Sequence, residues 1–418
     1  MHLERIRGKK SKKLDGKKII LGITGSIAAV ECVKLARELI RRGADVTAVM
    51  SKAAKKIIHP YALEFATGNK VVTEITGSIE HVKYLGVDGI ADLYLIAPST
   101  ANTISKIAQG IDDTPITTFA TTALGSGKPV IIVPAMHEAM MKNKAILENM
   151  QKLVNMNVEF VQPKIEEGKA KFPDIETICL HVERELYPKE LEGMKVVVTS
   201  GPTYEQLDPI RFISNRSSGK MGREIALEMW RRGAEVTLIT SKPTDLGLPM
   251  FKEVKVWSVD EMLKAALHEI ERGCDIFVSS AAASDFVVEM EAKKIKTTPR
   301  LNLRLKEAPK IIKEVRKIYN GHIIGFKAET GVRDEELLRI AEEKMEIDDL
   351  NMVVANDVLE RGMGTDDTRV LILTQKGGNG LKVTSQSLRR KLLKRISKTA
   401  YDICPCKYNM YFFPAYRA

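Results

Sequence analysis

The sequence predicts an α/β chain built from two doubly wound, mainly parallel sheets. Apolar strand-like runs alternate with stretches of helical periodicity along the 418 residues, a pattern typical of parallel sheets covered by helices on both faces. The chain also repeats itself: the eleven residues 41–51 return at 231–241, and seven of the eleven are identical. Each copy is the last part of a unit that consists of a strand, a Gly/Ser/Thr loop, a helix and a second strand. This repetition indicates two domains of similar construction.

The first domain is expected at residues 16–172, after a basic N-terminal arm at 1–15. Strand-like runs fall at 19–24, 46–50, 93–97, 130–133 and 158–161, with helical periodicity strongest at 27–42 and 143–156. Residues 163–192 are charged and contain three prolines. The sequence therefore predicts a linker near its end, at 173–193.

The second domain is expected at residues 194–400. Its strands are expected at 194–199, 235–240, 275–280, 321–327, 351–355 and 369–374, and its helices near 218–231, 259–272, 308–318, 333–346 and 386–398. Both domains are thus expected to be Rossmann-like or flavodoxin-like. Residues 401–418 form an atypical tail rich in aromatic side chains, to which no function is assigned.

Charge and cysteine content limit the classes of function. The net charge is +11, and residues 1–18 alone hold eight Lys/Arg against two acidic residues. A second basic cluster falls at 389–398, so solvated ends explain the charge better than nucleic-acid binding does. Five cysteines, an odd number without metal-ligand spacing, favour free thiols in a reducing cytoplasm. No apolar run reaches membrane-spanning length, so no membrane association is expected.

Three loops of the first domain carry polar side chains where a strand ends. They are residues 24–27, 98–103 and 134–138, and each is followed by a helix. The carboxyl ends of parallel strands face helix amino termini, whose free N–H groups suit a phosphate. One such loop is a weak signal, and helix capping explains one or two of the side chains. His81 lies just inside a predicted helix, where a histidine is more often structural than functional.

Taken together, these loops and the Ile79–His81 segment resemble the homo-oligomeric flavin-containing cysteine decarboxylases, most closely the phosphopantothenoylcysteine decarboxylases, over residues 16–172. The resemblance implies His81 as catalytic base and His137 as a ligand of the substrate carboxylate. It implies FMN bound by Gly25, Ser26, Ile27, Ser51, Ser99, Thr100, Asn102, Thr103, Ala135 and Met136. Flavin oxidation of the cysteine thiol would provide an electron sink for the loss of CO₂.

Two positions depart from the pattern of these decarboxylases. The family has Asn where this chain has His137, and it carries a cysteine proton donor in a lid. The corresponding stretch here, Glu167–Lys171, contains no cysteine, so the final proton donor is unassigned. A hydrogen bond from a histidine to a carboxylate is strongest when the imidazole is charged.

The most specific run of the second domain is Asp208–Gly222. Ser217, Ser218 and Gly219 are expected to open a helix, and Arg211, Arg216 and Lys220 bring positive charge to its amino-terminal end. Cations are unfavourable at a helix start, so their clustering indicates a bound anion. An unusually basic capped helix is the less favoured alternative.

With Ser279–Phe286, Lys293–Lys296, Gly325–Thr330, Lys344 and Ala355–Asp357, this run resembles the phosphopantothenate–cysteine ligases from residue 194 to about 400. The fused order resembles the bifunctional coenzyme A biosynthesis enzymes of bacteria and archaea. The resemblance implies that Lys294 stabilises charge, that Asn215 orients an acyl-cytidylate, and that Arg211 and Lys220 bind substrate. It implies CTP contacts from Ser279, Ser280, Ala281, Asp285, Lys294, Ala308, Pro309, Lys310, Ile311, Phe326 and Lys344. One family lysine is missing, replaced near Ile347 or Asp348.

The function implied is ligation of cysteine to 4′-phosphopantothenate with CTP, followed by FMN-dependent decarboxylation to 4′-phosphopantetheine. Mg²⁺ should bridge the triphosphate, although its protein ligands are unknown. Relatives imply a homo-oligomer with trimeric flavin domains and dimeric ligase domains. Two alternatives keep the ligase but give the flavin domain another role, prenyl transfer or a non-catalytic scaffold. A nicotinamide dehydrogenase is disfavoured because neither loop has the triple-glycine spacing.

Overall fold

The computed structural model describes residues 3–166, 169–297, 299–359 and 370–374. The expected helix at 386–398, the second basic cluster and the tail at 401–418 lie outside this part of the chain. Two compact units divide the chain, Met1–Tyr187 and Pro188–Ala418, and each has its own sheet. Within the described residues, no helix is long and apolar enough to span a bilayer.

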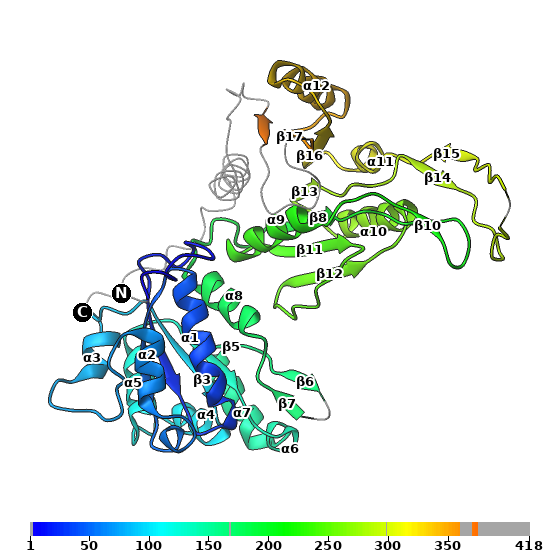
Figure 1. The fold of residues 1–418 in the computed structure, drawn as a ribbon. Coiled ribbons are helices and arrows are strands. Elements are labelled where there is room, and N and C mark those ends of the chain that lie inside the picture. The colour runs from blue at the N-terminus through cyan, green and yellow to red at the C-terminus, as the bar shows by residue number, and fades with distance from the viewer. Residues whose placement is uncertain (1–2, 167–168, 298, 360–369, 375–418) are drawn as a thin grey trace. The chain divides into compact units, whose positions relative to one another are not determined.

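The first unit contains a five-stranded sheet in the order β2-β1-β3-β4-β5 (Figure 1). All of its neighbouring strands are parallel. The strands are β1 (Lys18–Ile23), β2 (Asp45–Met50), β3 (Leu93–Ser99), β4 (Val130–Pro134) and β5 (Glu159–Phe160). All seven residues of β3 are buried, as expected for a central parallel strand covered on both faces. The predicted α/β class is confirmed.

Helices cover both faces of this sheet. One apolar core includes Leu35 and Ile178, and the other includes Ile104, Phe119 and Leu153. The helical elements are η1 (Ile27–Glu31), α1 (Cys32–Arg41), η2 (Ala54–Lys56), α2 (Pro60–Thr67), α3 (Glu80–Leu85), α4 (Ala101–Ala108), α5 (Pro115–Gly125), α6 (Glu138–Met141), α7 (Lys144–Val154) and α8 (Ile175–Leu186). Because the two cores lie on opposite faces, the unit is doubly wound.

The ends of the first unit differ from the expectation. Residues 173–193 were expected to form a linker, but α8 lies within them, and its residues Ile178, Cys179 and Val182 belong to the core. The charged positions of this amphipathic helix gave it the composition of a linker. The expected basic arm is also not separate, because Leu3 and Leu14 are buried in the same core. A short hairpin of β6 (Lys164–Glu166) and β7 (Lys169–Lys171) precedes α8.

The second unit contains a seven-stranded sheet in the order β12-β11-β8-β13-β16-β17-β18. The strands are β8 (Lys195–Ser200), β11 (Glu235–Thr240), β12 (Phe251–Lys255), β13 (Ile276–Ser279), β16 (His322–Glu329), β17 (Met352–Asp357) and β18 (Leu371–Thr374). All pairs are parallel except β17 with β18. The sequence reading missed β12, a half-exposed edge strand in which charged residues interrupt the apolar pattern.

The helices of the second unit are α9 (Lys220–Arg231), α10 (Val259–Glu271), α11 (Ile311–Ile318) and α12 (Asp334–Ile347). They begin and end within a few residues of the predicted positions. Two small hairpins, which the sequence did not predict, extend from the sheet. They pair β9 (Glu205–Gln206) with β10 (Phe212–Ile213) and β14 (Phe286–Val288) with β15 (Leu305–Glu307).

The repeated segments form the same corner in both units. In each, a helix ends and the chain turns through a glycine with positive φ, 106° at Gly43 and 101° at Gly233, before the next strand begins. A Cβ atom at Gly43 would lie 2.8 Å from the backbone nitrogen of Asp15, and one at Gly233 would lie 3.1 Å from the backbone of Glu192. Both corners therefore favour glycine for its conformation and for its small size.

The second arginine of each repeat is buried in this corner. The side chains of Arg42 and Arg232 are only 4% and 5% exposed. Each forms an ion pair with the glutamate four residues earlier on its helix, Glu38 or Glu228. The backbone N–H of a buried leucine donates to the carbonyl of each arginine, at 2.9 Å from Leu14 to Arg42 and 2.8 Å from Leu191 to Arg232.

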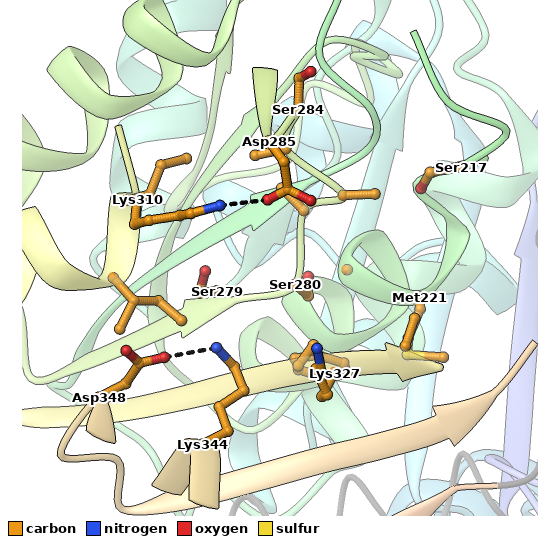
Figure 2. Close-up of a pocket in the computed structure, with 18 of the residues that line it drawn as sticks. Ser217, Met221, Ser279, Ser280, Ser284, Asp285, Lys310, Lys327, Lys344 and Asp348 are labelled. Atoms are coloured by element: carbon orange, nitrogen blue, oxygen red, sulfur yellow. Dashed lines mark hydrogen bonds and ion pairs between the residues drawn. The ribbon is translucent and has the colours of Figure 1, made fainter. Parts of the chain in front are cut away.

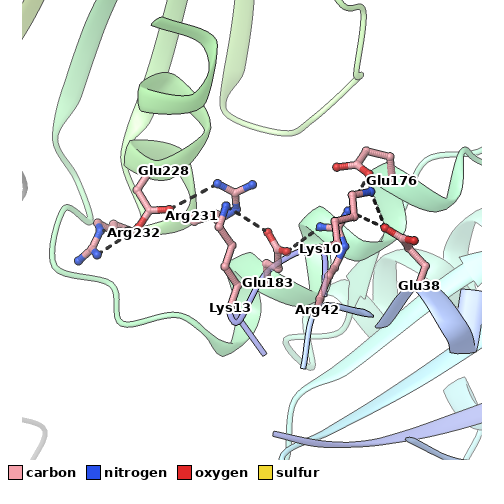
Figure 3. A network of polar contacts seen from close by, with 9 residues as sticks. All are labelled: Lys10, Lys13, Glu38, Arg42, Glu176, Glu183, Glu228, Arg231 and Arg232. Atoms are coloured by element: carbon pink, nitrogen blue, oxygen red, sulfur yellow. Dashed lines mark hydrogen bonds and ion pairs between the residues drawn. The ribbon is translucent and has the colours of Figure 1, made fainter. Parts of the chain in front are cut away.

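In the first unit, Arg42 is the centre of a larger ionic cluster (Figure 3). Its Nη1 atom donates to Glu183 Oε1 at 2.6 Å, and its Nη2 atom donates to Glu176 Oε2 at 2.6 Å. Lys10 pairs with Glu176 at 2.8 Å and with Glu38 at 2.5 Å. Because the side chain of Glu183 is fully buried, its charge depends on cations held within the fold.

We expect Arg42→Met to lower the free energy of unfolding of the first unit by about 3 kcal/mol, because the carboxylate of Glu183 loses its guanidinium in a buried site. The matched control is Arg41→Met, the preceding residue. Its side chain is 41% exposed, and its 3.4 Å ion pair with Glu38 leaves Arg42 in place beside that carboxylate, so the loss should stay below about 1 kcal/mol. Denaturant unfolding of the full chain measures both. Equal losses would show that the buried cluster contributes nothing beyond a surface pair.

Candidate functional site

The candidate site of the first unit lies where the strand order reverses. After β1 the chain builds β2 on one side and then returns to add β3 on the other side, so the loops after β1 and β3 diverge from a common edge. Hydrogen bonds join these two loops. The Thr24 hydroxyl donates to the Pro98 carbonyl at 2.8 Å and accepts from the Thr100 N–H at 3.0 Å.

The neighbouring loops meet this pair at the same edge of the sheet. Ala135 N donates to the Ser99 carbonyl at 2.9 Å, and Ser51 N donates to the Ile23 carbonyl at 3.0 Å. The four predicted cofactor-binding segments are therefore all at the carboxyl ends of adjacent strands. Their residues are Gly25, Ser26, Ile27, Ser51, Ser99, Thr100, Asn102, Thr103, Ala135 and Met136.

The side chains at this edge include both satisfied and unsatisfied polar groups. Thr100 caps α4, since its hydroxyl accepts from the Thr103 N–H, and Ser26 caps η1 in the same way. Capping thus explains these two hydroxyls, as the sequence reading anticipated. Ser99 is different, because its hydroxyl is fully buried and has no hydrogen-bond partner among the described residues. Ile27 is 77% exposed, which is unusual for a large apolar side chain.

The two predicted catalytic-site histidines of the first unit are placed differently. His81 is on α3, and its ring packs edge-on against Phe119 of α5 with centroids 6.5 Å apart. Its Nδ1 atom is buried without a hydrogen-bond partner in the described part of the chain. His137 is exposed at the N-cap of α6, directly after Met136. Among the described residues, neither ring forms a hydrogen bond with the four loop segments.

In the second unit, a cavity of about 710 Å³ opens at the corresponding position, where the strand order reverses between β8 and β13. Its walls come from the start of α9, from the loop after β13, from the start of α11 and from α12. Ten predicted site residues line it: Lys220, Ser279, Ser280, Ala281, Asp285, Pro309, Lys310, Ile311, Phe326 and Lys344. Segments up to 124 residues apart, from Lys220 to Lys344, therefore meet at one site.

The start of α9 is packed closely against the sheet at this cavity. Gly219, one of the three residues predicted to open this helix, is its N-cap, and the Gly219 carbonyl accepts from the Ser200 hydroxyl at 2.8 Å. A Cβ atom at Gly222 would lie 2.4 Å from Ser280 Oγ and 2.7 Å from Ser200 Cβ. Glycine at this position lets the helix amino terminus approach the loop that follows β13, where its N–H groups face the cavity.

Two lysine–carboxylate pairs lie in the cavity wall (Figure 2). Lys310 pairs with Asp285 at 2.6 Å, and Lys344 pairs with Asp348 at 2.7 Å. In Figure 2, Ser279 is seen between them. Cations already paired with carboxylates at a cavity can exchange those partners for the oxygens of a phosphorylated ligand.

Four predicted residues do not line this cavity. Asn215 donates from Nδ2 to the Ala282 carbonyl at 2.6 Å, so its loop is attached next to the cavity wall. Ala308 is buried, and its N–H donates to the Asp285 carbonyl at 2.9 Å. Lys294 is exposed on a stretch between β14 and β15, and Arg211 bonds that stretch rather than the cavity.

Sequence reasoning missed four charged residues that line the cavity: Lys313, Lys327, Glu343 and Asp348. Lys327 belongs to a quoted segment but was not assigned a role. Asp348 is four residues after Lys344, a spacing that brings side chains together on a helix, and this signal was available. Lys313 lines the cavity because α11 lies in its wall, and only the fold reveals the position of that helix.

Comparison with known proteins agrees with this division of the chain. The family described as Flavoprotein matches residues 7–186, and the family described as DNA/pantothenate metabolism flavoprotein C-terminal domain matches residues 191–400. A solved structure described as the C-terminal domain of coenzyme A biosynthesis bifunctional protein CoaBC is 30% identical. It covers 51% of this chain and 99% of its own, with a TM-score of 0.42.

Two relatives match along almost the whole chain. The coenzyme A biosynthesis bifunctional protein CoaBC of Thermococcus kodakarensis is 50% identical over 404 residues, which is 95% of this chain and 99% of that protein. Its counterpart in Methanocaldococcus jannaschii is 40% identical over 399 residues, which is 94% of this chain and 96% of that protein. The chain therefore belongs to the family of bifunctional coenzyme A biosynthesis proteins, with a flavoprotein domain followed by a pantothenate-metabolism domain.

Proposed function

We propose that this chain converts 4′-phosphopantothenate and cysteine into 4′-phosphopantetheine in two steps. The second unit acts as a phosphopantothenate–cysteine ligase, and the first unit then acts as a phosphopantothenoylcysteine decarboxylase. The observation that carries the proposal is a pair of separate sites, each at the strand-order reversal of its own sheet, in a chain that matches bifunctional relatives along its length.

In the ligase step, a carboxylate oxygen of 4′-phosphopantothenate attacks the α-phosphorus of CTP, and the bond to the pyrophosphate leaving group breaks. The amine of cysteine then attacks the resulting acyl-cytidylate, and CMP leaves. Lys220, Lys310 and Lys344 are lysines of the cavity wall that would bind the phosphates. Lys294 would stabilise the charge that develops during the first attack, and Asn215 would orient the acyl-cytidylate.

The choice of CTP and the need for Mg²⁺ rest on the resemblance to ligases of this family. Lysines alone do not neutralise a triphosphate, so Mg²⁺ would supply further positive charge. In the cavity wall, Lys310 and Lys344 are paired with Asp285 and Asp348. Each lysine would exchange its carboxylate partner for phosphate oxygens of the nucleotide.

The first unit suits a flavin on the basis of its unsatisfied polar groups. Ser99 presents a buried hydroxyl without a partner among the described residues, and His81 presents a buried Nδ1 atom in the same condition. FMN, when bound, supplies the redox chemistry of the decarboxylation. The four loop segments at the sheet edge would hold it. His81 would accept a proton from the substrate, and the exposed His137 would bind the substrate carboxylate.

The partners proposed for this chain are its own copies and its small substrates. The resemblance implies trimeric flavin domains and dimeric ligase domains. Because His81 Nδ1 has no hydrogen-bond partner among the described residues of its own unit, a site completed by a neighbouring copy is consistent with the structure.

The experiment gives the purified full chain 4′-phosphopantothenate, CTP, Mg²⁺ and cysteine and follows pyrophosphate and CO₂ separately. We expect both products, with FMN absorbance in the protein. Pyrophosphate without CO₂ would retain the ligase and give the flavin unit another role, such as prenyl transfer or a scaffold. The absence of pyrophosphate would overturn the ligase assignment.

A further inference from the structure

The lysine assigned to the ligase reaction lies on a stretch that has no regular structure. Residues 289–304 join β14 to β15 without a helix or strand among the described positions, and Lys294 is exposed on this stretch. No helix or strand ladder therefore fixes its main chain. Its position depends on the contacts that the stretch makes with the rest of the unit.

Three hydrogen bonds join residues 291–295 of this stretch to one turn. Glu291 N donates to the Leu207 carbonyl at 2.9 Å, Ile295 N donates to Asp208 Oδ2 at 3.1 Å, and Arg211 Nη1 donates to the Ile295 carbonyl at 2.9 Å. Ile295, the residue next to Lys294, is thus held through both its N–H and its carbonyl. The anchoring residues 207–211 form the turn between β9 and β10.

Asp208 is the centre of this anchor, and its two oxygens have separate tasks. Oδ1 accepts from the N–H groups of Ile210 at 2.7 Å and Arg211 at 2.8 Å, which closes the turn. Oδ2 accepts from Ile295 N and, at 2.8 Å, from Arg211 Nη1, which holds the lysine stretch. The side chain of Asp208 is fully buried, yet it accepts four hydrogen bonds and pairs with a guanidinium.

These donors keep the carboxyl group ionised. Burial by itself raises the pKa of Asp208, but hydrogen bonds from the N–H groups of Ile210, Ile295 and Arg211 outweigh burial and lower the pKa to about 2. A buried carboxylate that binds donors from two different segments is a strong connection between them.

The same hairpin also leads to Asn215. After β10, the Ser214 hydroxyl donates to the Thr203 carbonyl at 2.7 Å, and Asn215 Nδ2 donates to the Ala282 carbonyl at 2.6 Å. Asp208 therefore anchors the Lys294 stretch to the hairpin whose second strand continues directly into Asn215. Both side chains assigned to the ligase chemistry depend on one short element.

We propose that Asp208, assisted by Arg211, is a positioning residue of the ligase: it fixes the main chain beside Lys294 relative to the hairpin that carries Asn215. This inference rests on the proposed function, because it acts through Lys294. Correct placement of a charged group matters because small displacements from the productive geometry slow a reaction strongly.

Asp208→Asn tests the proposal in the full chain. The retained oxygen can still close the turn, but the amide nitrogen cannot accept from Ile295 N. We expect kcat for pyrophosphate release to fall roughly tenfold to a hundredfold while KM for CTP changes little. Release of CO₂ from supplied 4′-phosphopantothenoylcysteine should stay at the wild-type rate because that reaction belongs to the first unit, and the retained KM for CTP shows that the second unit is folded. An unchanged kcat would overturn the proposal.

A double-mutant cycle separates positioning from a general structural effect. If Asp208 acts through Lys294, then Asp208→Asn should cause little further loss in a Lys294→Ala background. An equally large further loss in that background would overturn the proposal. Ile295→Pro gives a second test if Asp208→Asn fails to fold. It removes the N–H donor and also restricts the main chain of Lys294, so it should slow pyrophosphate release, and a wild-type rate would contradict the anchor.

The controls keep this inference distinct from the proposed function. If wild-type protein releases no pyrophosphate, the proposed function fails. If wild type is active but Lys294→Ala is equally fast, the ligase function stands and the role of Lys294 fails. If Lys294→Ala is slow but Asp208→Asn is fast, only the positioning role fails.

The anchor also predicts a pH dependence of stability. Because folding lowers the pKa of Asp208 from 3.8 to about 2, its stabilising contribution is complete above about pH 4 and is lost as the pH falls through about 2. The difference in unfolding free energy between wild type and Asp208→Asn should therefore be constant from pH 7 to about pH 5 and then shrink. Denaturant unfolding at stepwise lower pH measures it, and a constant difference down to pH 2 would contradict the ionised anchor.

Discussion

Lys294→Gln is expected to reduce pyrophosphate release by about a hundredfold or more, because the substitution removes the positive charge that would stabilise the developing negative charge on the phosphate. The decarboxylase reaction should be unaffected, since Lys294 belongs to the second unit. The measurement follows pyrophosphate from the complete substrate mixture and CO₂ from supplied 4′-phosphopantothenoylcysteine.

The matched control for this substitution is Lys293→Gln, which removes the same charge one residue earlier on the same exposed stretch. Successive side chains of an extended chain point in different directions, so this variant should release pyrophosphate at close to the wild-type rate. Equal losses in the two variants would indicate that the stretch contributes only a general positive field.

His81→Asn is expected to have the opposite effect. CO₂ formation should fall by at least about a hundredfold, since general base catalysis contributes about that much or more, while pyrophosphate release continues. Asparagine retains a polar side chain in the pocket beside Phe119 but cannot take up a proton near neutral pH. His59→Asn is the control, because His59 is an exposed histidine of the same unit at the N-cap of α2.

Retained flavin absorbance in His81→Asn would show that the FMN site is intact. A variant that loses CO₂ formation together with the flavin would point to a role of His81 in binding. If either His81→Asn or Lys294→Gln abolished both activities in folded protein, the assignment of one reaction to each unit would be wrong.

The sequence predicted the architecture well because the hydrophobic pattern and the turn residues agree. Every central strand of both sheets was found within about two residues, and the helix that follows Gly219 begins where Ser217–Gly219 indicated. Fully buried parallel strands are continuous apolar runs, which are easy to recognise. The half-exposed β12 and the two-residue strands β9 and β10 have no such pattern, and the sequence did not reveal them.

The sequence predicted which residues belong to the site better than it predicted how they are arranged. Motif residues from distant segments do meet at one cavity, but the sequence could not show that Lys294 and Arg211 lie outside its wall. Asp208 was quoted only as the start of a motif, because the partner that gives it a role, Ile295, is 87 residues away. A hydrogen bond between irregular segments leaves no periodic signal in a sequence.

The corner that repeats at Gly43 and Gly233 stands at the amino-terminal end of its strand, opposite the edge that carries the ligand loops. The Arg-Arg-Gly corner of the repeat thus provides the same way of turning the chain and burying an arginine in both units. It lies at the opposite end of the strand from Ser51, the predicted FMN contact with which the first copy of the repeat ends. The loops at the opposite edge differ between the two units, so the same framework can serve different ligands. A search for catalytic residues that started from this repeated corner would therefore lead to the edge of each sheet opposite the ligand loops.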